Sequence, residues 1–450
     1  MPFKLQRFIW PAVFLLLGSI AAYYGCSAES HAVQEQMIGY PNSDLKAHSL
    51  RPWLLGLLCF LPFITSLAYS LSGTLDRYTM RQFLTAFSIC FGALFSLMML
   101  EDLQDNVSDF KESSDAAALM AKHYLVKLPS LIVFILPYSL MLSLLWCLGK
   151  MSRSQEIVSM IQTGRGVTRI VAPLIGFGVL AAVICIIFNY HWAPYADGQE
   201  RTILQAAKGD ITAEANNVAY QNHSNTRQWF VGSFPYRHSD GAPLEDISIT
   251  EIDEDNHIIR RIHASTATWS RQDKTWTLVN PVIYDLTVSP MPTIKKLEEP
   301  MITKWKETPW QIIKPGLKPP YLGIPGLNSW LANHQEHPLS DKRSYLTHWH
   351  YRFAQPFICL ITILLAAPLG IVFTRRGIGG GIAVAIFLCA GMIFCSTVFP
   401  TLGESGHLSP FWAAWATNIL FTCVALVLFY RRMTGQPIYQ AVMNFLASER

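Results

Sequence analysis

The residues of this chain that could carry chemistry form no recognisable catalytic or nucleotide-binding motif. Neither GxxxxGKS nor GxxxxGKT occurs, so the chain has no phosphate-binding P-loop of its own. The glycine cluster after Arg375 and Arg376 follows no predicted strand, and we interpret it as a flexible turn or a close helix contact. Ser405 and His407 have no acid-base partner at a recognisable spacing. The sequence therefore predicts no catalytic residue and no cofactor.

Two groups could bind ions, but each has a simpler interpretation. His348 and His350 flank a tryptophan with no third ligand in view, which favours an interfacial aromatic anchor over a metal site. An acidic segment that begins with Glu101, Asp102 and Asp105 is typical of a solvated face. It could also contact an anionic lipid headgroup through a bridging cation. We predict no metal site.

The composition indicates a membrane protein with a soluble insert. The chain has 450 residues, of which 51% are hydrophobic and 15% charged. Its formal net charge of +4 gives no concentrated basic patch, so nucleic-acid binding is not predicted. The nine cysteines lie in or beside apolar runs without a CxxC pair, and we expect inert, buried thiols.

Eight apolar runs are each close to the length of about 20 residues that a spanning helix needs. The runs at residues 8–26 and 53–71 are interpreted as a hairpin that returns to the cytoplasm, although the first could also be a cleaved signal peptide. Arg and Lys cluster in the short inner loops, so we expect both ends of the chain in the cytoplasm. The other six runs are residues 83–100, 130–148, 170–189, 353–373, 382–399 and 411–430.

Residues 191–345 form a long polar segment whose centre alternates as strands do. Ile247 and Ile249 share one face of a predicted strand, and turn residues separate it from further alternating runs. We expect a β-sandwich-like or open-barrel domain outside the membrane. A return strap at residues 298–338 follows, with a helix at about 324–334.

A polar, basic stretch at residues 148–173 separates two of the spans, and its Lys and Arg residues place it on the cytoplasmic side. Ser152 and Gln155 predict a capping-box helix start, and Gly164 predicts the end of this helix. Glu156 places a carboxylate near the start. The apolar face at helical spacing consists of Ile157, Met160 and Ile161. Such a helix suits the docking of a separate motor protein, or it is an ordinary interfacial helix.

Three blocks of the sequence resemble one known family. They are LDRYTMRQFL from residue 75, LPYSLMLSLLWCLGKMSRSQEIVSMIQTGRGVTRIVAPLI from residue 136 and YRFAQPFICLITILLAAPLGIVFTRRG from residue 351. With the alternating domain between them, they are similar to the lipopolysaccharide-export permeases LptF and LptG over residues 75–432. The middle block is the most specific, because it combines Ser152, Arg153 and Glu156 with a glycine after the helix.

The resemblance implies a membrane α-helical fold of six transmembrane helices with a periplasmic β-jellyroll between the third and fourth. The N-terminal hairpin would be an addition to that fold. The implied function is the non-catalytic transmembrane permease subunit of an ABC-type lipopolysaccharide exporter in the bacterial inner membrane. A separate LptB-type dimer would hydrolyse ATP, a paired LptF/LptG-type permease would complete the transporter, and LptC and LptA would receive the lipid.

The resemblance also assigns roles to particular residues. The ATPase-coupling residues it implies are Arg153, Glu156, Ile157, Met160, Ile161 and Gly164. The candidates for an apolar lipid path inside the β domain are Trp269, Trp276, Leu278 and Tyr284, and the last three belong to a run that alternates mostly at period two and so predicts one shared face. The possible headgroup contacts are Glu101, Asp102 and Asp105. These three are acidic where a phosphate-rich lipid would favour basic residues, so a bridging cation or a different headgroup would be needed.

We expect five parts along the chain. They are an N-terminal extension (1–73), a first transmembrane half (74–190) with the coupling helix at 151–166, a periplasmic domain with its strap (191–345), a second transmembrane half (346–432) and a cytoplasmic tail (433–450). Two other functions are open. A non-transporting regulator could relay ATPase motion to a periplasmic partner, and a lipid-modifying enzyme would need convergent acid-base residues that the polar segment does not display.

Overall fold

Eight helices in the described part of the chain are long and apolar enough to cross a membrane, in agreement with the eight apolar runs. The computed structural model describes residues 6–36, 46–111, 116–207, 213–222, 227–235, 242–253, 257–270, 273–286, 293–305, 307–313, 316–333, 338–371 and 378–434. The predicted tail from residue 435 onward, together with Arg375 and Arg376, lies outside these ranges.

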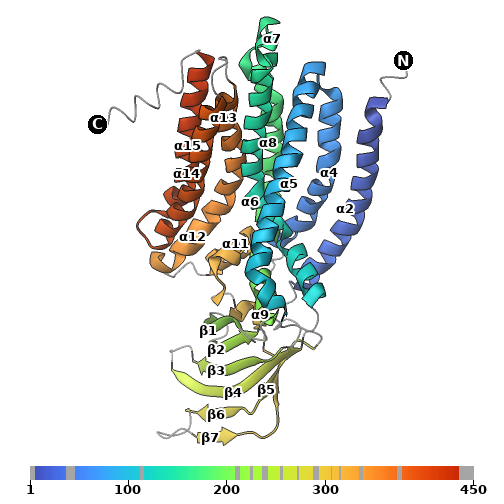
Figure 1. The fold of residues 1–450 in the computed structure, drawn as a ribbon. Helices are drawn as coiled ribbons and strands as arrows, with labels where there is room; N and C mark the ends of the chain where they lie inside the picture. Colours follow the sequence, from blue (N-terminus) through green and yellow to red (C-terminus); the bar gives the residue numbers. More distant parts are fainter. Residues whose placement is uncertain are drawn as a thin grey trace.

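The helices form a bundle with a sheet at one end (Figure 1). Those before the sheet are η1 (Gln6–Phe8), α2 (Ile9–Gln36), α4 (Leu50–Leu71), α5 (Thr74–Lys111), α6 (Ala116–Arg153), α7 (Glu156–Gln162), α8 (Val167–Tyr190) and α9 (Trp192–Ala207). Those after it are α10 (Pro309–Ile313), η4 (Pro319–Tyr321), α11 (Ile324–Asn333), α12 (Leu339–Ala354), η5 (Gln355–Phe357), α13 (Ile358–Gly370), α14 (Ile378–Glu404) and α15 (Pro410–Met433). Helix α11 confirms the predicted strap helix, and α12, η5 and α13 together make one candidate span.

Two spans are longer than predicted. The acidic segment after the third apolar run, which the sequence places beyond the span, continues α5 as far as Lys111, and α6 begins at Ala116. Each helix has 38 residues. At a rise of about 1.5 Å per residue each reaches roughly 57 Å, well beyond the hydrocarbon thickness of a membrane. The polar ends stay helical because their side chains bond to one another and to α9.

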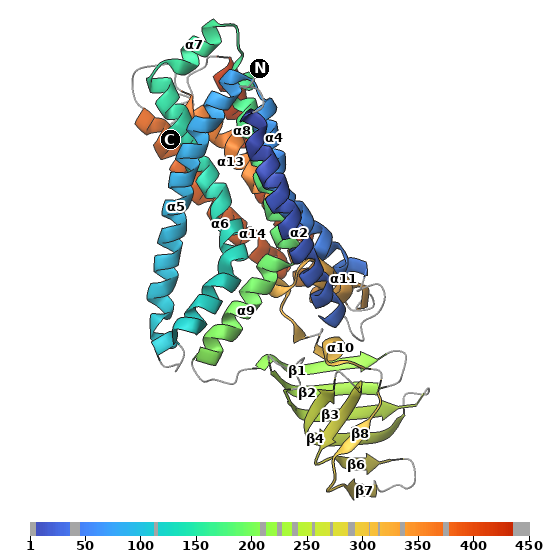
Figure 2. The ribbon, with the colours of Figure 1, turned by 90° about the vertical axis from the view of Figure 1, so that its right-hand side faces the viewer.

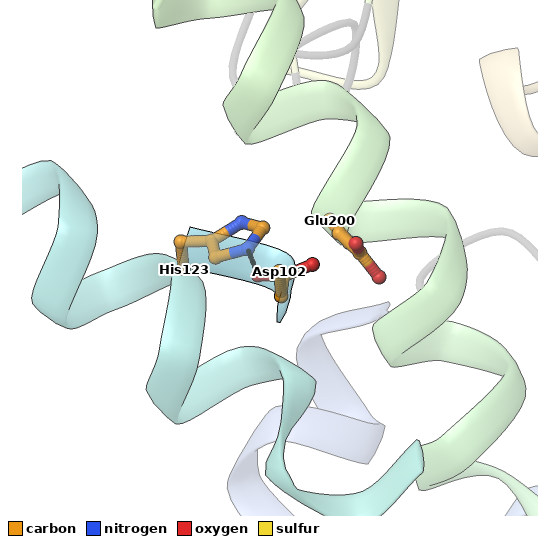
Figure 3. A group of neighbouring side chains, drawn as sticks. All are labelled: Asp102, His123 and Glu200. Atoms are coloured by element: carbon orange, nitrogen blue, oxygen red, sulfur yellow. Dashed lines mark hydrogen bonds and ion pairs between the residues drawn. The ribbon is translucent and has the colours of Figure 1, made fainter. Parts of the chain in front are cut away.

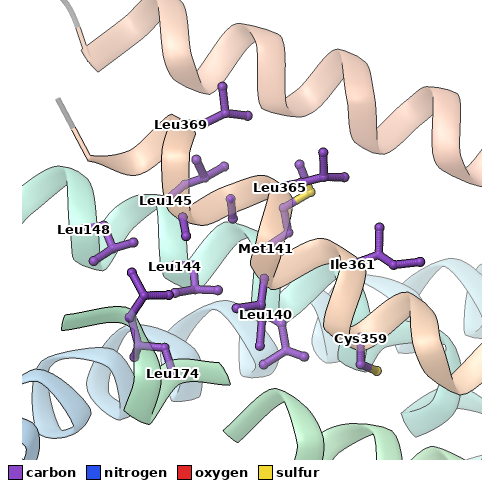
Figure 4. Packing of buried hydrophobic residues seen from close by; sticks show 14 of the residues in the cluster. Leu140, Met141, Leu144, Leu145, Leu148, Leu174, Cys359, Ile361, Leu365 and Leu369 are labelled. Atoms are coloured by element: carbon purple, nitrogen blue, oxygen red, sulfur yellow. The ribbon is translucent and has the colours of Figure 1, made fainter. Parts of the chain in front are cut away.

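The bundle core lies where α6, α8 and α13 meet (Figure 4). Leu140 and Leu144 of α6 and Leu174 of α8 are completely buried there. The end of α13 approaches α6 so closely that a Cβ at Gly370 would lie 2.9 Å from the Cβ of Leu148. A glycine is therefore required at this helix contact. The hairpin helices α2 and α4 pack along each other, and α4 contacts α8 (Figure 2).

The polar segment folds into an antiparallel sheet at the end of the bundle opposite α7 (Figures 1 and 2). Its strands are β1 (Ala213–Asn222), β2 (Arg227–Pro235), β3 (Leu244–Ile252), β4 (Ile258–Ser270), β5 (Thr275–Val279), β6 (Val282–Asp285), β7 (Thr293–Lys296) and β8 (Met301–Thr303). The order is β1-β2-β3-β4-β5-β8. Strand β4 pairs with β5 through its second half and with β6 through its first, and β6 pairs with β7.

The apolar side chains of the strands gather in one buried core, together with those of α10. Ile247 and Ile249 are completely buried, which confirms the predicted alternation of β3. The prediction that Tyr284 shares a face with the core residues of β5 is wrong, because Ile283 packs against the core instead. Asn280, between β5 and β6, has a left-handed φ of 52° and ends the alternation. A residue with this backbone conformation shifts the alternation of faces, so the period of β5 does not carry over to β6.

Candidate functional site

The α7 segment, residues 151–166, projects from the end of the bundle opposite the sheet and joins α6 to α8 (Figure 1). Ile157 and Met160 are buried in the bundle core, and Ile161 packs against it. The predicted apolar face therefore holds α7 against its own chain. The exposed residues of this segment are Arg153, Ser154, Ser159, Gln162, Thr163, Gly164 and Gly166. A protein that binds here meets a polar surface.

The capping box predicted for this segment is wrong. Ser152 belongs to α6, and its hydroxyl donates to the carbonyl of Gly370 at 3.2 Å, so a tertiary contact replaces the local cap. Gln155 precedes α7 with a left-handed φ of 60° and makes no side-chain cap. The predicted end is confirmed, because α7 ends at Gln162 and Gly164 adopts a φ of 87° that favours glycine.

The Glu156 carboxylate is held by donors of its own chain. Tyr78 of α5 donates its hydroxyl proton to Oε2 at 3.0 Å, and the Ser154 hydroxyl donates to Oε1 at 2.8 Å. Gln82 donates to the Tyr78 hydroxyl oxygen at 3.4 Å, and Lys150 of α6 donates to Gln82 at 3.4 Å. A surface chain of hydrogen bonds therefore links α6, α5 and α7.

A second contact joins the start of α5 to the turn after α7. Asp76 is only 8% exposed, and its carboxylate oxygens accept from Arg165 at 3.0 Å and from Arg169 at 3.1 Å. A buried carboxylate that faces two guanidinium groups is well satisfied. The first turns of α5 therefore contact the chain on both sides of α7.

At the other end of α5, a polar cluster connects three helices (Figure 3). His123 Nε2 of α6 lies 3.1 Å from Asp102 Oδ2, and Lys127 donates both to Asp102 and, at 2.5 Å, to Glu200 of α9. The side chains of Asp102, His123 and Glu200 are close enough to hold a metal ion. The Lys127 ammonium already supplies the positive charge that these carboxylates require.

The three predicted headgroup contacts differ in their surroundings, because only one of them belongs to this cluster. Asp102 uses both carboxylate oxygens within the chain, whereas Glu101 and Asp105 are exposed. About one helical turn further along the same two helices, the Ser130 hydroxyl of α6 donates to Asp197 of α9 at 2.5 Å. Burial raises the pKa of the Asp197 carboxyl above its usual range, and the Ser130 hydrogen bond opposes this.

A third polar cluster fixes the N-terminal hairpin to the joint between α8 and α9. Arg51 of α4 is 3% exposed and pairs with Glu29 of α2 at 2.5 Å. The Tyr190 hydroxyl donates to the carbonyl of Ala47 at 2.7 Å. The His191 ring lies 5.9 Å from that of His48. Burial, followed by the nearby Arg51 and His48, holds the pKa of His191 well below its ordinary value.

The four lipid-path candidates lie in two different environments. Trp269, Trp276 and Leu278 belong to the packed core of the sheet, together with Trp229, whose ring centroid is 5.1 Å from that of Trp276. Helix α10 adds two buried isoleucines to this core. Tyr284 is half-buried on β6 and is not part of the core cluster. Three of the four candidates are therefore buried against other side chains of the sheet.

The remaining candidates of the second half have structural partners. His348 Nε2 lies 2.6 Å from Glu404 Oε1, which ties α12 to the end of α14. Trp349 donates to Asn328 Oδ1 at 2.7 Å and so joins α12 to α11. Ser405 donates its hydroxyl proton to the carbonyl of Leu402 in the turn before α15.

Comparison with known proteins identifies the family. The family model described as "Lipopolysaccharide export system permease LptF/LptG" matches residues 77–431. The chain belongs to the LptF/LptG family. It is also 25% identical over 326 residues to the lipopolysaccharide export system permease protein LptG of Haemophilus influenzae (strain ATCC 51907 / DSM 11121 / KW20 / Rd), with 71% of this chain and 87% of that protein covered. As an LptF/LptG permease the chain is a transport subunit, and α2 and α4 lie outside the matched residues.

Sequence reasoning missed the polar contacts that join distant helices. Asp76 is 89 residues from Arg165, and Lys127 is 73 residues from Glu200. A signal for both was present, because an ionisable residue inside or next to an apolar span is expected to have a specific partner. The sequence alone does not identify the partner of each ionisable residue, because the partners are far apart along the chain.

Proposed function

We propose that this permease is driven by a separate ATPase that docks on the α7 segment, and that it passes lipopolysaccharide from the inner membrane to periplasmic proteins at the sheet. A second, related permease would complete the transporter. Under this proposal the end of the bundle with α7 is cytoplasmic and the sheet is periplasmic. ATP hydrolysis takes place on the partner.

The observation that carries the proposal is the exposed polar surface of α7 at the end of the bundle opposite the sheet. The segment is short, ordered by its own buried residues and joined to two spans. A docked motor can therefore push on two spans through one rigid element. The basic residues around α7 support a cytoplasmic position.

Reconstitution tests the proposal. Proteoliposomes that contain this chain, a related permease and an LptB-type ATPase should release lipopolysaccharide to an added periplasmic acceptor only with ATP. Release without the ATPase, or none with all components present and hydrolysis active, contradicts the proposal. A Walker-motif variant of the ATPase is the matched control.

A non-transporting regulator is the second candidate, and the side-chain packing of the sheet core favours it. A regulator would relay ATPase motion without a path for lipid. A photo-crosslinking residue at Trp269, which lies at the edge of the core with 9% exposure, distinguishes the two. ATP-dependent crosslinks to lipopolysaccharide support export, and crosslinks to protein alone support the regulator.

A further inference from the structure

The first turns of α5 hold the α7 segment on both of its sides. Where α7 begins, the Tyr78 hydroxyl bonds to Glu156 at 3.0 Å. Where α7 has ended, Asp76 bonds to Arg165 and Arg169 at 3.0 and 3.1 Å. Asp76 and Tyr78 are two residues apart, so one helical turn carries both contacts.

We propose that Asp76 and Tyr78 are positioning residues that pass movement of the α7 segment to α5. This inference rests on the function proposed above and adds the residues through which the docked motor acts. They act through Glu156 and through the arginines after α7.

The two contacts differ in a way that suits this role. Asp76 is buried and its pair with Arg165 is partly shielded from solvent, so salt screens it less than an exposed pair. Tyr78 is 39% exposed, and its hydrogen bond to Glu156 lies at the surface. The Asp76 contact is therefore the stronger of the two, and the surface hydrogen bond of Tyr78 adds a second, weaker connection between α5 and the segment.

Helix α5 can carry such a movement to the opposite end of the bundle. Its far end contains Asp102, which bonds to Lys127, and Lys127 bonds to Glu200 of α9. Helix α9 is the last helix before β1. Each end of α5 is therefore tied to its neighbours by directional polar contacts. The apolar surface between the two ends has no such contacts among those described, so α5 can shift there against the neighbouring helices.

The test uses proteoliposomes of the complete transporter, in which lipopolysaccharide transferred per ATP hydrolysed is measured. Asp76→Asn and Tyr78→Phe remove one contact each. Asp76→Glu keeps the charge, and Thr85→Val removes an exposed hydroxyl that donates to the carbonyl of Arg81 in the same helix. We expect Asp76→Asn to lower the ratio by about fivefold or more, the lower end of a typical coupling. Tyr78→Phe should lower it less, both controls should match the wild type, and all variants should retain the ATPase.

An unchanged ratio in both Asp76→Asn and Tyr78→Phe overturns the proposal. Loss of the ATPase from both variants also overturns it, because the residues would then shape the docking surface itself. If Asp76→Asn does not accumulate, Tyr78→Phe decides alone, since it removes an exposed hydroxyl and leaves the core intact. Failure of the proposed function is distinguishable, because the wild-type transporter would then bind no ATPase or move no lipid.

Discussion

Glu156 is the residue at which the docking of a motor can be tested most simply. The residue lies half-buried at the start of α7, and its carboxylate accepts from two donors at the surface, Tyr78 and Ser154. We predict that Glu156→Lys abolishes lipid export while membrane abundance stays near normal, because charge reversal at a docked interface costs about 2 to 5 kcal/mol. Glu156→Gln keeps an acceptor and should be milder. Immunoblots with export assays measure both, and normal export in Glu156→Lys contradicts the docking role.

Trp276 tests the stability of the sheet at the scale of one side chain. It is completely buried, and its Nε1 donates to the carbonyl of Glu307 at 2.7 Å. Trp276→Ala should lower the free energy of unfolding of the sheet by about 3 to 5 kcal/mol, because a large cavity is left. Trp276→Phe fills most of that space and loses the hydrogen bond, for about 1 to 3 kcal/mol. Urea titration of protease resistance orders the variants, and equal stability would contradict the packed core.

The N-terminal hairpin is an element whose docking should depend on pH. The end of the hairpin nearer the sheet meets the α8–α9 joint at His191, which faces His48, Arg51, Trp192 and Tyr195. The pKa of His191 is below its ordinary value when docked, so an undocked state binds the proton more readily. Docking is therefore complete above the ordinary pKa and weakens as the pH falls through it.

We predict that the amides of residues 46–49, directly before α4, exchange faster, after correction for intrinsic rates, when the pH is lowered from about 7.5 to about 5.5. The matched control His191→Gln cannot take up a proton and should show no such change. The same pH dependence in His191→Gln would assign the titration to another group.

How far the sequence predicts each element depends on whether the interactions that fix it are local. The spans follow from the length of local apolar runs and the alternation of Ile247 and Ile249 from local periodicity, and the structure has both, together with the α11 helix. The start of α7 depends on a contact between Ser152 and Gly370, which are 218 residues apart, so a local capping rule fails there. The face of Tyr284 depends on one left-handed residue, which periodicity does not reveal.

At the scale of the whole molecule, the two ends of the bundle should lie on opposite sides of the membrane. Arg153 beside α7 and Lys295 of β7 are both exposed, at opposite ends. After replacement of the nine natural cysteines, an impermeant thiol reagent should label Lys295→Cys in intact spheroplasts and label Arg153→Cys only after lysis. Labelling of Arg153→Cys in intact spheroplasts would reverse the topology.

The central claim is that this permease works with a separate ATPase and carries lipopolysaccharide. The most direct measurement is purification of the chain from native membranes in mild detergent, followed by mass spectrometry of the bound proteins and lipids. We predict a second LptF/LptG-type permease, an LptB-type ATPase and lipopolysaccharide in the purified complex. Recovery of the chain with ordinary phospholipid and without any ATPase would contradict the account.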